Sequence, residues 1–563
     1  MQGRKVLEQK LFYSFSIEAA VPEDNFYRKL ERAVDLSWVR QRVAECYSDI
    51  GRHSIDPEVI VKVELVGYLE GITSERQLMR EIADRLSLRR YVGYDLDEEV
   101  PDHSTLSKAR DLLGKDLFQA VFDRSVRLCQ AAGMVGGVHS SVDRSVVQAN
   151  ASLDSLEPRV VEMSPEQFVE RLFAENPAPA AEVAERREEM SPTDLCARPG
   201  YPRRLRAAVQ SPVSEPSPSE AAASETPVGE AVSLPAVVQP SVSGRTLSEA
   251  RASEPSASEV AVENGEDKKE KPTPSNYTHV SRTDPEAMIA KRRGKPAILG
   301  YSAEVWVDGR CGVITHADGF SANVPEQATV VQGLLRQRDE FGIAVSGLSG
   351  DKGYGQGRLY RQLNAHHVVG YIPHQEKVNS AGGPGLYREE DFTYDPSISG
   401  YKCKAGCVLK YKGVEVNWPS AGRVYQAAGR DCHRCDLRTK CTKAKGGRKL
   451  KVSIYQAEFH EMDKRLAGPG ARLAAVARRV GPEPRFGQAK QWQGMDRAKY
   501  RGLQKFKGQV LMTAAAQNIK KYVNWVWRKG QGAGQKRMED LGVARTFLLG
   551  LTLANQNALV PIN

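Results

Sequence analysis

Two segments of the chain, ILGYSAEVWVD at residues 298–308 and GVITHADGF at residues 312–320, decide the fold. Both favour strands, and the glycine between them predicts a tight turn. EQATVVQGLLRQRDEFG follows at residues 326–342, with the apolar spacing of an amphipathic helix that ends at Gly342. Strands that alternate with helices predict a layered α/β core.

The same alternation continues on both sides of this region. Upstream, VGGVHSSVDRSVVQANAS at residues 135–152 sets valines in a polar context and predicts another strand. Beyond Ala471, apolar and basic residues alternate with helical spacing up to about Lys529. Downstream, a strand, a helix and a strand are predicted in IAVSGLSGD (343–351), GRLYRQLNAH (357–366) and HVVGYIPH (367–374).

Residues 1–135 predict an N-terminal domain made of helices. Ser74 followed by Gln77 forms a capping box at the start of one helix, and two later helices are expected to end at Gly114 and Gly133. Short helices with several arginines are typical of DNA-binding domains. A helical dimerisation module would show the same pattern.

Composition and charge limit the function classes. The 563 residues include no run of 18 apolar ones, and the N-terminal segment lacks the apolar stretch of a signal peptide, so a cytoplasmic protein without membrane contact is expected. The net charge is +10, but residues 441–540 hold 23 basic and 7 acidic residues, a local net charge of +16. This block favours nucleic acid as a partner, although a basic surface that only aids solubility has the same composition.

A change in composition marks an insertion at residues 157–276. Its central part is rich in Pro and Ser and has one aromatic residue, Tyr201, between residues 201 and 260, so a disordered insertion is predicted because little apolar surface can be buried. The other predicted segments are the helical domain (1–135), the first core strand (136–156), the continued core (277–376), a Cys-rich insertion (377–450), a C-terminal helical part of the core (451–535) and a tail (536–563).

Three acidic residues lie where elements of an α/β core would expose them: Asp143 in VDRSVVQANAS, Asp351 in GLSGDKGYG and Glu483 in PEPRFGQAK. Mg²⁺ and Mn²⁺ prefer carboxylate oxygens, and two such ions can hold the attacking and leaving oxygens of a phosphoryl transfer. Each acid alone is equally typical of a helix cap or a solvated charge.

In their order along the chain, these motifs resemble the DDE transposases of bacterial insertion sequences. VDRSVVQANAS and SGDKGYG are followed by R-x3-E-x6-K, formed by Arg479, Glu483 and Lys490. Three further segments are similar to parts of this family: PDHSTLSKAR (101–110), TDPEA (283–287) and RGLQKFKGQVLMTAAAQNIKK (501–521).

The chain departs from the family signature at two places. Val476 stands where the family usually has a tyrosine. Gly481 and Pro482 interrupt the helix between Arg479 and Glu483, so Glu483 is expected at or beside the start of a new helix.

The resemblance implies a ribonuclease-H-like fold, with a mixed sheet flanked by helices. It implies that Asp143, Asp351 and Glu483 bind two Mg²⁺ or Mn²⁺ ions. The implied activity is hydrolysis of phosphodiester bonds at the terminal inverted repeats of an insertion sequence, followed by transfer of the 3′-OH ends into target DNA. The implied partners are double-stranded DNA and at least one further copy of the chain, and the implied location is the bacterial nucleoid in the cytoplasm.

Four residues are candidates for DNA contact. Arg479 and Lys490 follow from the family signature and would bind phosphates of the transposon end. Lys352 is either a phosphate contact or a surface lysine. Trp492 would stack on a base or pack within the protein.

Five cysteines lie within forty residues, and the CxxC spacing of two of them is typical of a tetrahedral zinc site. Similar cysteines occur in a subset of these transposases. A structural Zn²⁺ is therefore predicted, against unligated thiols or a redox pair as alternatives. The predicted ligands are Cys403, Cys432, Cys435 and Cys441, with Cys407 or His433 as a substitute.

Two other functions fit the same motifs. One is a zinc-stabilised DNA-binding protein without cleavage activity. The other is a ribonuclease-H-like nuclease that recognises DNA structure or RNA content and does not depend on inverted repeats.

Overall fold

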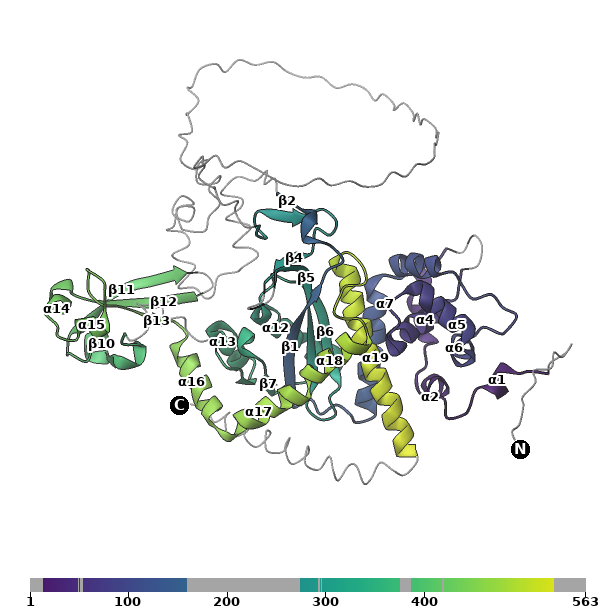
Figure 1. The fold of residues 1–563 in the computed structure, drawn as a ribbon. Helices are drawn as coiled ribbons and strands as arrows, with labels where there is room; N and C mark the ends of the chain where they lie inside the picture. The colour runs from purple at the N-terminus through teal and green to yellow at the C-terminus, as the bar shows by residue number, and fades with distance from the viewer. Residues whose placement is uncertain are drawn as a thin grey trace, which may run out of the picture. The chain divides into compact units, whose positions relative to one another are not determined.

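The computed structural model describes residues 14–530, with a long gap at 159–273, a shorter gap at 375–385 and small gaps at 49, 51–53, 292–293, 295 and 418–419. Its centre is a six-stranded mixed sheet (Figure 1). The strands follow the order β4-β5-β1-β7-β8, and β6 also pairs with β5. Their bounds are β1 (His139–Gln148), β4 (Met288–Ala290), β5 (Ile298–Asp308), β6 (Ile314–Ser321), β7 (Gly347–Ser349) and β8 (Val369–Tyr371).

The strand directions explain how the chain builds this sheet. β1 is antiparallel to β5 and parallel to β7, and β5 and β6 form the hairpin predicted from residues 298–320. The parallel strands β7 and β8 are joined through α13 (Gly357–Ala365), because parallel neighbours require a crossover connection. The sequence therefore predicted the alternation of strands and helices in this core correctly.

Helices cover both faces of the sheet. On one face, Val142 and Trp306 pack against α12 (Val330–Phe341) and α13. On the other face, alternate β5 residues such as Tyr301 and Val305 pack against α18 (Pro482–Trp492) and α19 (Leu503–Gly530). Because side chains alternate along a strand, Asp143 shares the second face with its β5 partner Val305.

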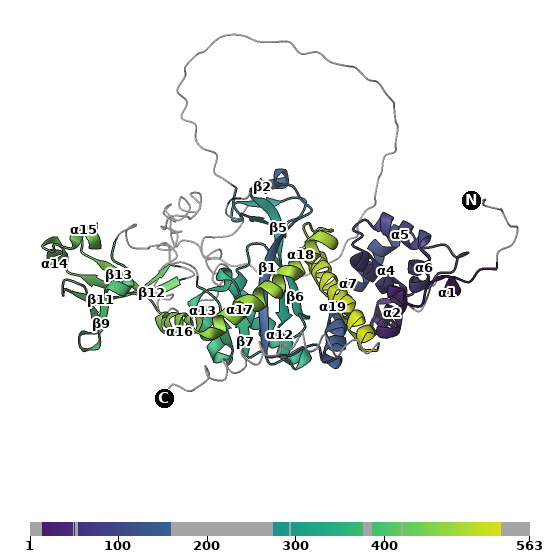
Figure 2. The same ribbon diagram turned by 60° about the horizontal axis from the view of Figure 1, so that its bottom comes forward.

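The N-terminal region is helical, as the sequence predicted. Ser74 caps α5 by accepting from the Gln77 backbone N–H at 3.4 Å, and Gly114 interrupts α7 with a positive φ of 64°. α19 lies beside α7 in both views (Figures 1 and 2). The helices are α1 (Ile17–Ala20), α2 (Phe26–Ala33), α3 (Trp38–Arg42), α4 (Pro57–Glu70), α5 (Glu75–Asp84), α6 (Leu86–Val92) and α7 (His103–Ala131).

The Cys-rich segment forms an antiparallel sheet of its own, with the order β13-β12-β11-β10-β9. Tyr401, Leu409 and Tyr425 belong to its small core. Two short helices carry two of the cysteines, Cys432 and Cys441, and Cys435 lies between these helices. The elements are β9 (Thr393–Asp395), β10 (Gly400–Lys402), β11 (Val408–Asn417), β12 (Ser420–Ala427), β13 (Lys449–Ser453), α14 (Gly429–His433) and α15 (Arg438–Cys441).

The predicted disordered insertion lies mostly outside the described residues, as does the predicted tail at 536–563. The two ends of the insertion are described, and they meet. β2 (Leu156–Pro158) pairs antiparallel with β3 (His279–Ser281). None of the helices in the described ranges has the length and apolar character needed to cross a bilayer.

Candidate active site

Asp143 and Asp351 come from neighbouring parallel strands. Asp143 lies in β1, and Asp351 is two residues beyond the last residue of β7. Ser141 pairs with Ser349 in the register of these strands, so each aspartate follows its serine by two residues. Because adjacent strands are about 4.8 Å apart, this register brings the two aspartates to the same part of the sheet.

Glu483 reaches this region from α18. α17 (Pro469–Val480) ends one residue before Gly481, and Pro482 opens α18, where the lack of an N–H costs no helical hydrogen bond. Glu483 is therefore in the first turn of α18, as the sequence predicted. Both α17 and α18 pack against β1, and both views show them crossing the sheet beside it (Figures 1 and 2).

The three acids interact electrostatically. The pKa of Asp143 is raised to about 6, mainly by burial and in addition by the negative charges of Asp351 and Glu483. The Arg144 backbone N–H, which donates to Oδ1 of Asp143 at 2.9 Å, opposes this shift, as does the positive charge of Arg478. Carboxylates that raise the pKa of a neighbour repel it, and a divalent cation would remove that repulsion.

A fourth carboxylate, Glu326, lies beside Asp351. A Cβ atom on Gly353 would be 1.7 Å from Oε2 of Glu326 and 3.0 Å from Oδ1 of Asp351, so both carboxylates crowd the same turn. The pKa of Glu326 is raised to about 7, mainly by burial and in addition by the charges of Asp351 and Asp143. Sequence reasoning missed this residue because an acid that precedes a helix is usually an ordinary favourable charge.

The donor atoms at this site are suited to a hard cation. Oε2 of Glu326 is buried and accepts no hydrogen bond within the described part of the chain. Carboxylate oxygens are the ligands that Mg²⁺ and Mn²⁺ prefer. Among the described residues, however, no three Cys, His, Asp or Glu side chains already stand in an arrangement that could hold a metal ion.

A buried ion pair supports the strand that carries Asp143. Nη2 of Arg144 is 2.6 Å from Oε2 of Glu304 in β5, and both side chains are almost fully buried. Oε2 of Glu304 also accepts from the Thr329 hydroxyl at 2.7 Å, and Arg144 donates to the Val324 carbonyl at 2.8 Å. The network ties β1 to β5 and to the segment before α12, on the opposite side of β1 from Asp143.

The candidate DNA-contact residues have different surroundings. Arg479 is exposed, and its neighbour Arg478 is the one that approaches Glu483, with Nη2 3.8 Å from Oε1. Lys352 is exposed beside Asp351, and Lys490 is partly buried in the last turn of α18. Trp492 is 65% exposed, so its ring does not pack in the core.

The five clustered cysteines line one small cavity together with Leu409 and Arg448. The Arg448 backbone N–H donates to Sγ of Cys432 at 3.3 Å, and the thiols of Cys403 and Cys407 are hydrogen-bonded to each other. Burial and the neighbouring Cys403 raise the pKa of the Cys407 thiol to about 11. His433 is exposed, and its Nδ1 lies 2.6 Å from the Gly429 carbonyl oxygen.

Comparison with known families covers two parts of the chain. Residues 15–112 match the family described as Transposase domain (DUF772), and residues 402–523 match the family described as Transposase DDE domain. The two matched parts of the chain are similar to domains of transposases, the second of them to a DDE domain. The second match includes the cysteine cluster and Glu483, whereas Asp143 and Asp351 lie between the two matched segments.

The matches confirm the resemblance to DDE transposases of insertion sequences. No curated protein and no solved structure matches the chain significantly. The roles of individual residues therefore rest on the geometry of this chain.

Proposed function

We propose that this transposase, working in the bacterial nucleoid, binds the terminal inverted repeats of an insertion sequence, hydrolyses phosphodiester bonds at its ends and transfers the 3′-OH ends into target DNA. The observation that supports the proposal is the electrostatic effect of Asp351 and Glu483 on Asp143, together with the β1–β7 register that brings the two aspartates to the same part of the sheet. The sheet order supports a ribonuclease-H-like core, because β1 lies between β5, which forms a hairpin with β6, and the parallel strands β7 and β8.

In this proposal Asp143, Asp351 and Glu483 hold two Mg²⁺ or Mn²⁺ ions, and Glu326 supplies a further oxygen beside Asp351. Bound ions of this kind neutralise charge on the reacting phosphate and activate the attacking oxygen. Other residues position the acids. The Arg144–Glu304 ion pair holds β1 against β5, and Gly481 and Pro482 determine where α18 begins. Arg478, Arg479, Lys490, Lys352 and Trp492 are the proposed contacts to the DNA around the cut.

Substitution Asp351→Asn tests the proposal. It is expected to reduce nicking of an inverted-repeat duplex in Mg²⁺ by about 10³-fold or more, because a neutral amide is a poor ligand. Duplex affinity is expected to stay within about threefold, since Asp351 makes no phosphate contact. Asp339→Asn, at an exposed acid paired with Arg338 at 2.8 Å, is the matched control and should nick normally.

Normal nicking by the Asp351→Asn variant would overturn the assignment. Binding without nicking by the wild-type chain, unchanged by Asp143→Asn, would favour the binding protein without cleavage activity. Equal nicking of duplexes with intact and scrambled repeats would favour a structure-directed nuclease.

Joining two ends requires at least a dimer on DNA, which light scattering of the complex would measure.

We also propose a structural Zn²⁺ in the cavity of the Cys-rich sheet, held by Cys403, Cys432, Cys435 and Cys441. The convergence of these thiols on one cavity supports this proposal, and so does the backbone N–H donated to Cys432. Cys407 lines the same cavity and is the available substitute. Such an ion would stabilise a sheet with a small apolar core.

Metal analysis of the purified full-length chain tests this second proposal. We expect one zinc ion per chain, its loss in Cys432→Ser together with a lower melting temperature, and its retention in the control Cys46→Ser, which changes an exposed cysteine outside the cluster. Zinc-free protein whose melting temperature is unaffected by Cys432→Ser would contradict it, as would a disulfide within the cluster.

A further inference from the structure

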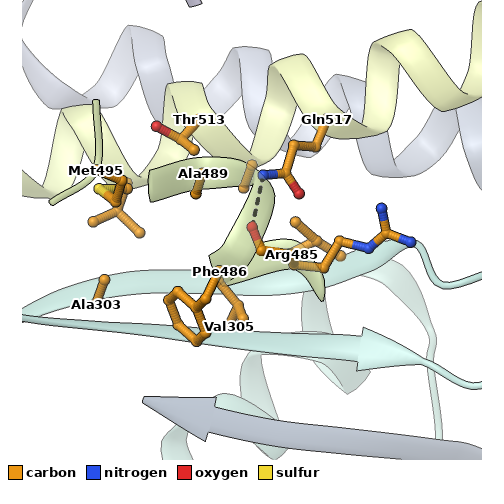
Figure 3. A pocket seen from close by; sticks show the side chains of 11 residues that line it. Ala303, Val305, Arg485, Phe486, Ala489, Met495, Thr513 and Gln517 are labelled. Carbon is orange, nitrogen blue, oxygen red and sulfur yellow. Dashed lines mark hydrogen bonds between the residues drawn. The ribbon is translucent and has the colours of Figure 1, made fainter. Parts of the chain in front are cut away.

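The guanidinium of Arg485 has no acceptor in the described part of the chain. Arg485 lies in α18, and burial lowers the pKa of its side chain. Its Nε is completely buried and unpaired. The backbone around it is fixed, because its carbonyl accepts from the Gln517 side chain at 3.1 Å and the next residue, Phe486, belongs to the core (Figure 3). In Figure 3 the guanidinium extends away from the apolar residues, and no hydrogen bond is drawn to it.

A second cation, Lys521 of α19, lies next to this guanidinium. A Cβ atom on Gly312, in the turn between β5 and β6, would be 3.0 Å from Nη2 of Arg485 and 3.3 Å from Nζ of Lys521. The two nitrogens therefore cannot be further apart than the sum of these distances. Gly312 has a positive φ of 67°, so the turn favours glycine and leaves the space between the cations free of a side chain.

No carboxylate in the described residues balances this pair. The pKa of Lys521 is lowered to about 8, mainly by burial and in addition by Arg485, while only the thiols of Cys311 and Cys129 oppose this shift. Nζ of Lys521 donates to the Cys311 carbonyl at 2.5 Å. The acid that precedes the turn, Asp308, accepts from the backbone N–H groups of Gly136, Gly137 and Arg310.

Two like charges withdrawn from water without a counter-ion are costly, and an anion that reaches both would offset that cost. A guanidinium binds a phosphate through two parallel hydrogen bonds, and an ammonium adds a point charge. Two further cations, Arg310 and Lys529, also lower the pKa of the Cys311 thiol, whereas Asp308 raises it; both cations are exposed. This combination suits a phosphate on a longer polyanion better than an isolated small anion.

We propose that Arg485 and Lys521, at the β5–β6 turn, bind one backbone phosphate of duplex DNA. The inference rests on the proposed function in taking DNA as the partner, but it assigns a contact outside the acidic site. Residues two apart on a helix do not share a face, so the phosphate at Arg485 is not the one beside Glu483. The contact fixes the position of DNA relative to the first turn of α18.

Salt-dependent binding tests this contact with the full-length chain. The probe is a fluorescein-labelled duplex of arbitrary sequence, about 30 base pairs long, titrated by anisotropy between about 50 and 300 mM NaCl. The double variant Arg485→Gln/Lys521→Gln is expected to lower the salt slope by about 1 and the affinity by about tenfold, as for the loss of one phosphate contact. Lys507→Gln is the matched control, because Lys507 is on the same helix and is already paired with Asp318 at 3.2 Å.

Thermal unfolding without DNA provides a second measurement. Removing two unbalanced, partly buried charges should leave the melting temperature equal or higher. A clear fall would overturn the proposal by revealing a structural role. The proposal would also be overturned if the double variant bound the duplex with the same salt slope and affinity as the wild type. Pyrophosphate could raise the melting temperature of the wild type but not of the variant, while the salt slope of duplex binding is the same for both. In that case the site binds small anions, and the assignment to DNA is wrong. A wild-type chain that binds no duplex at all would instead contradict the proposed function.

Discussion

Glu326 shows how partial burial and neighbouring negative charges raise the pKa of a single carboxylate. Its pKa is raised from 4.5 to about 7, so the unfolded chain gives up this proton at lower pH than the folded chain. The stability that protonated Glu326 contributes is complete below about pH 4.5 and is lost as the pH rises through about 7. Without metal, the charged form therefore destabilises the fold at alkaline pH.

Substitution Glu326→Gln should remove this penalty. We expect the metal-free variant to be more stable than the wild type by about 1–2 kcal/mol at pH 8, after allowance for partial exposure, and close to it at pH 4.5. Urea unfolding at the two pH values measures the difference, and Mg²⁺ should narrow the gap at pH 8. Glu340→Gln, at an exposed acid paired with Arg127, is the control. An equal difference at both pH values would show that the effect is not electrostatic.

The break between α17 and α18 sets the geometry of the site at the scale of the element. A Cβ atom on Gly481 would be 2.8 Å from the Ala477 carbonyl oxygen, so Gly481→Ala must shift the start of α18 and with it Glu483. We expect a loss of about 1–2 kcal/mol in stability and a fall in nicking. Gly487→Ala is the matched control on the same helix, where a Cβ meets nothing within 4 Å, and it should stabilise by about 0.5–1 kcal/mol. Equal nicking by both variants would contradict this role of the break.

Elements were more predictable than contacts. Apolar alternation marked β1, β5 and β6, and the Gly481–Pro482 pair marked the helix break, because these signals are local in sequence. The approach of Arg478 to Glu483 was not predictable from the R-x3-E-x6-K spacing, since adjacent helical residues point in different directions and the break reorients the second helix. Glu326 and the Arg144–Glu304 pair depend on how distant segments pack, and no local pattern distinguishes them from ordinary surface charges.

At the scale of the whole molecule, the helical N-terminal region and the C-terminal segment support each other. The Gln493 side chain, just after α18, donates to the Tyr68 carbonyl at 3.1 Å, and the Tyr500 hydroxyl donates to Glu75 at 2.8 Å. Arg110 is 2.9 Å from Glu64 and lies over the ring of Tyr500. The end of the helix that carries Glu483 is therefore held by the region that matches the N-terminal transposase domain.

The pairing of β2 with β3 predicts that the long insertion can be removed. Because Leu156 pairs with Ser281 and Pro158 with His279, the chain leaves and re-enters the folded part at one place. Replacing residues 160–274 by a short Gly/Ser linker should change the melting temperature by no more than about 3 °C, since a loop's closure entropy depends only weakly on its length.

A longer deletion provides the control for this variant. Removing residues 156–281, and with them β2 and β3, should lower the melting temperature by several degrees. The reason is that Ser281 accepts from the Asp284 backbone N–H at 3.1 Å, and Oδ1 of Asp284 in turn accepts from the Tyr301 hydroxyl at 2.6 Å. A cooperative transition that disappears in the shorter deletion would show that the fold depends on the inserted residues. Preserved melting with lost nicking would assign them a role in the reaction.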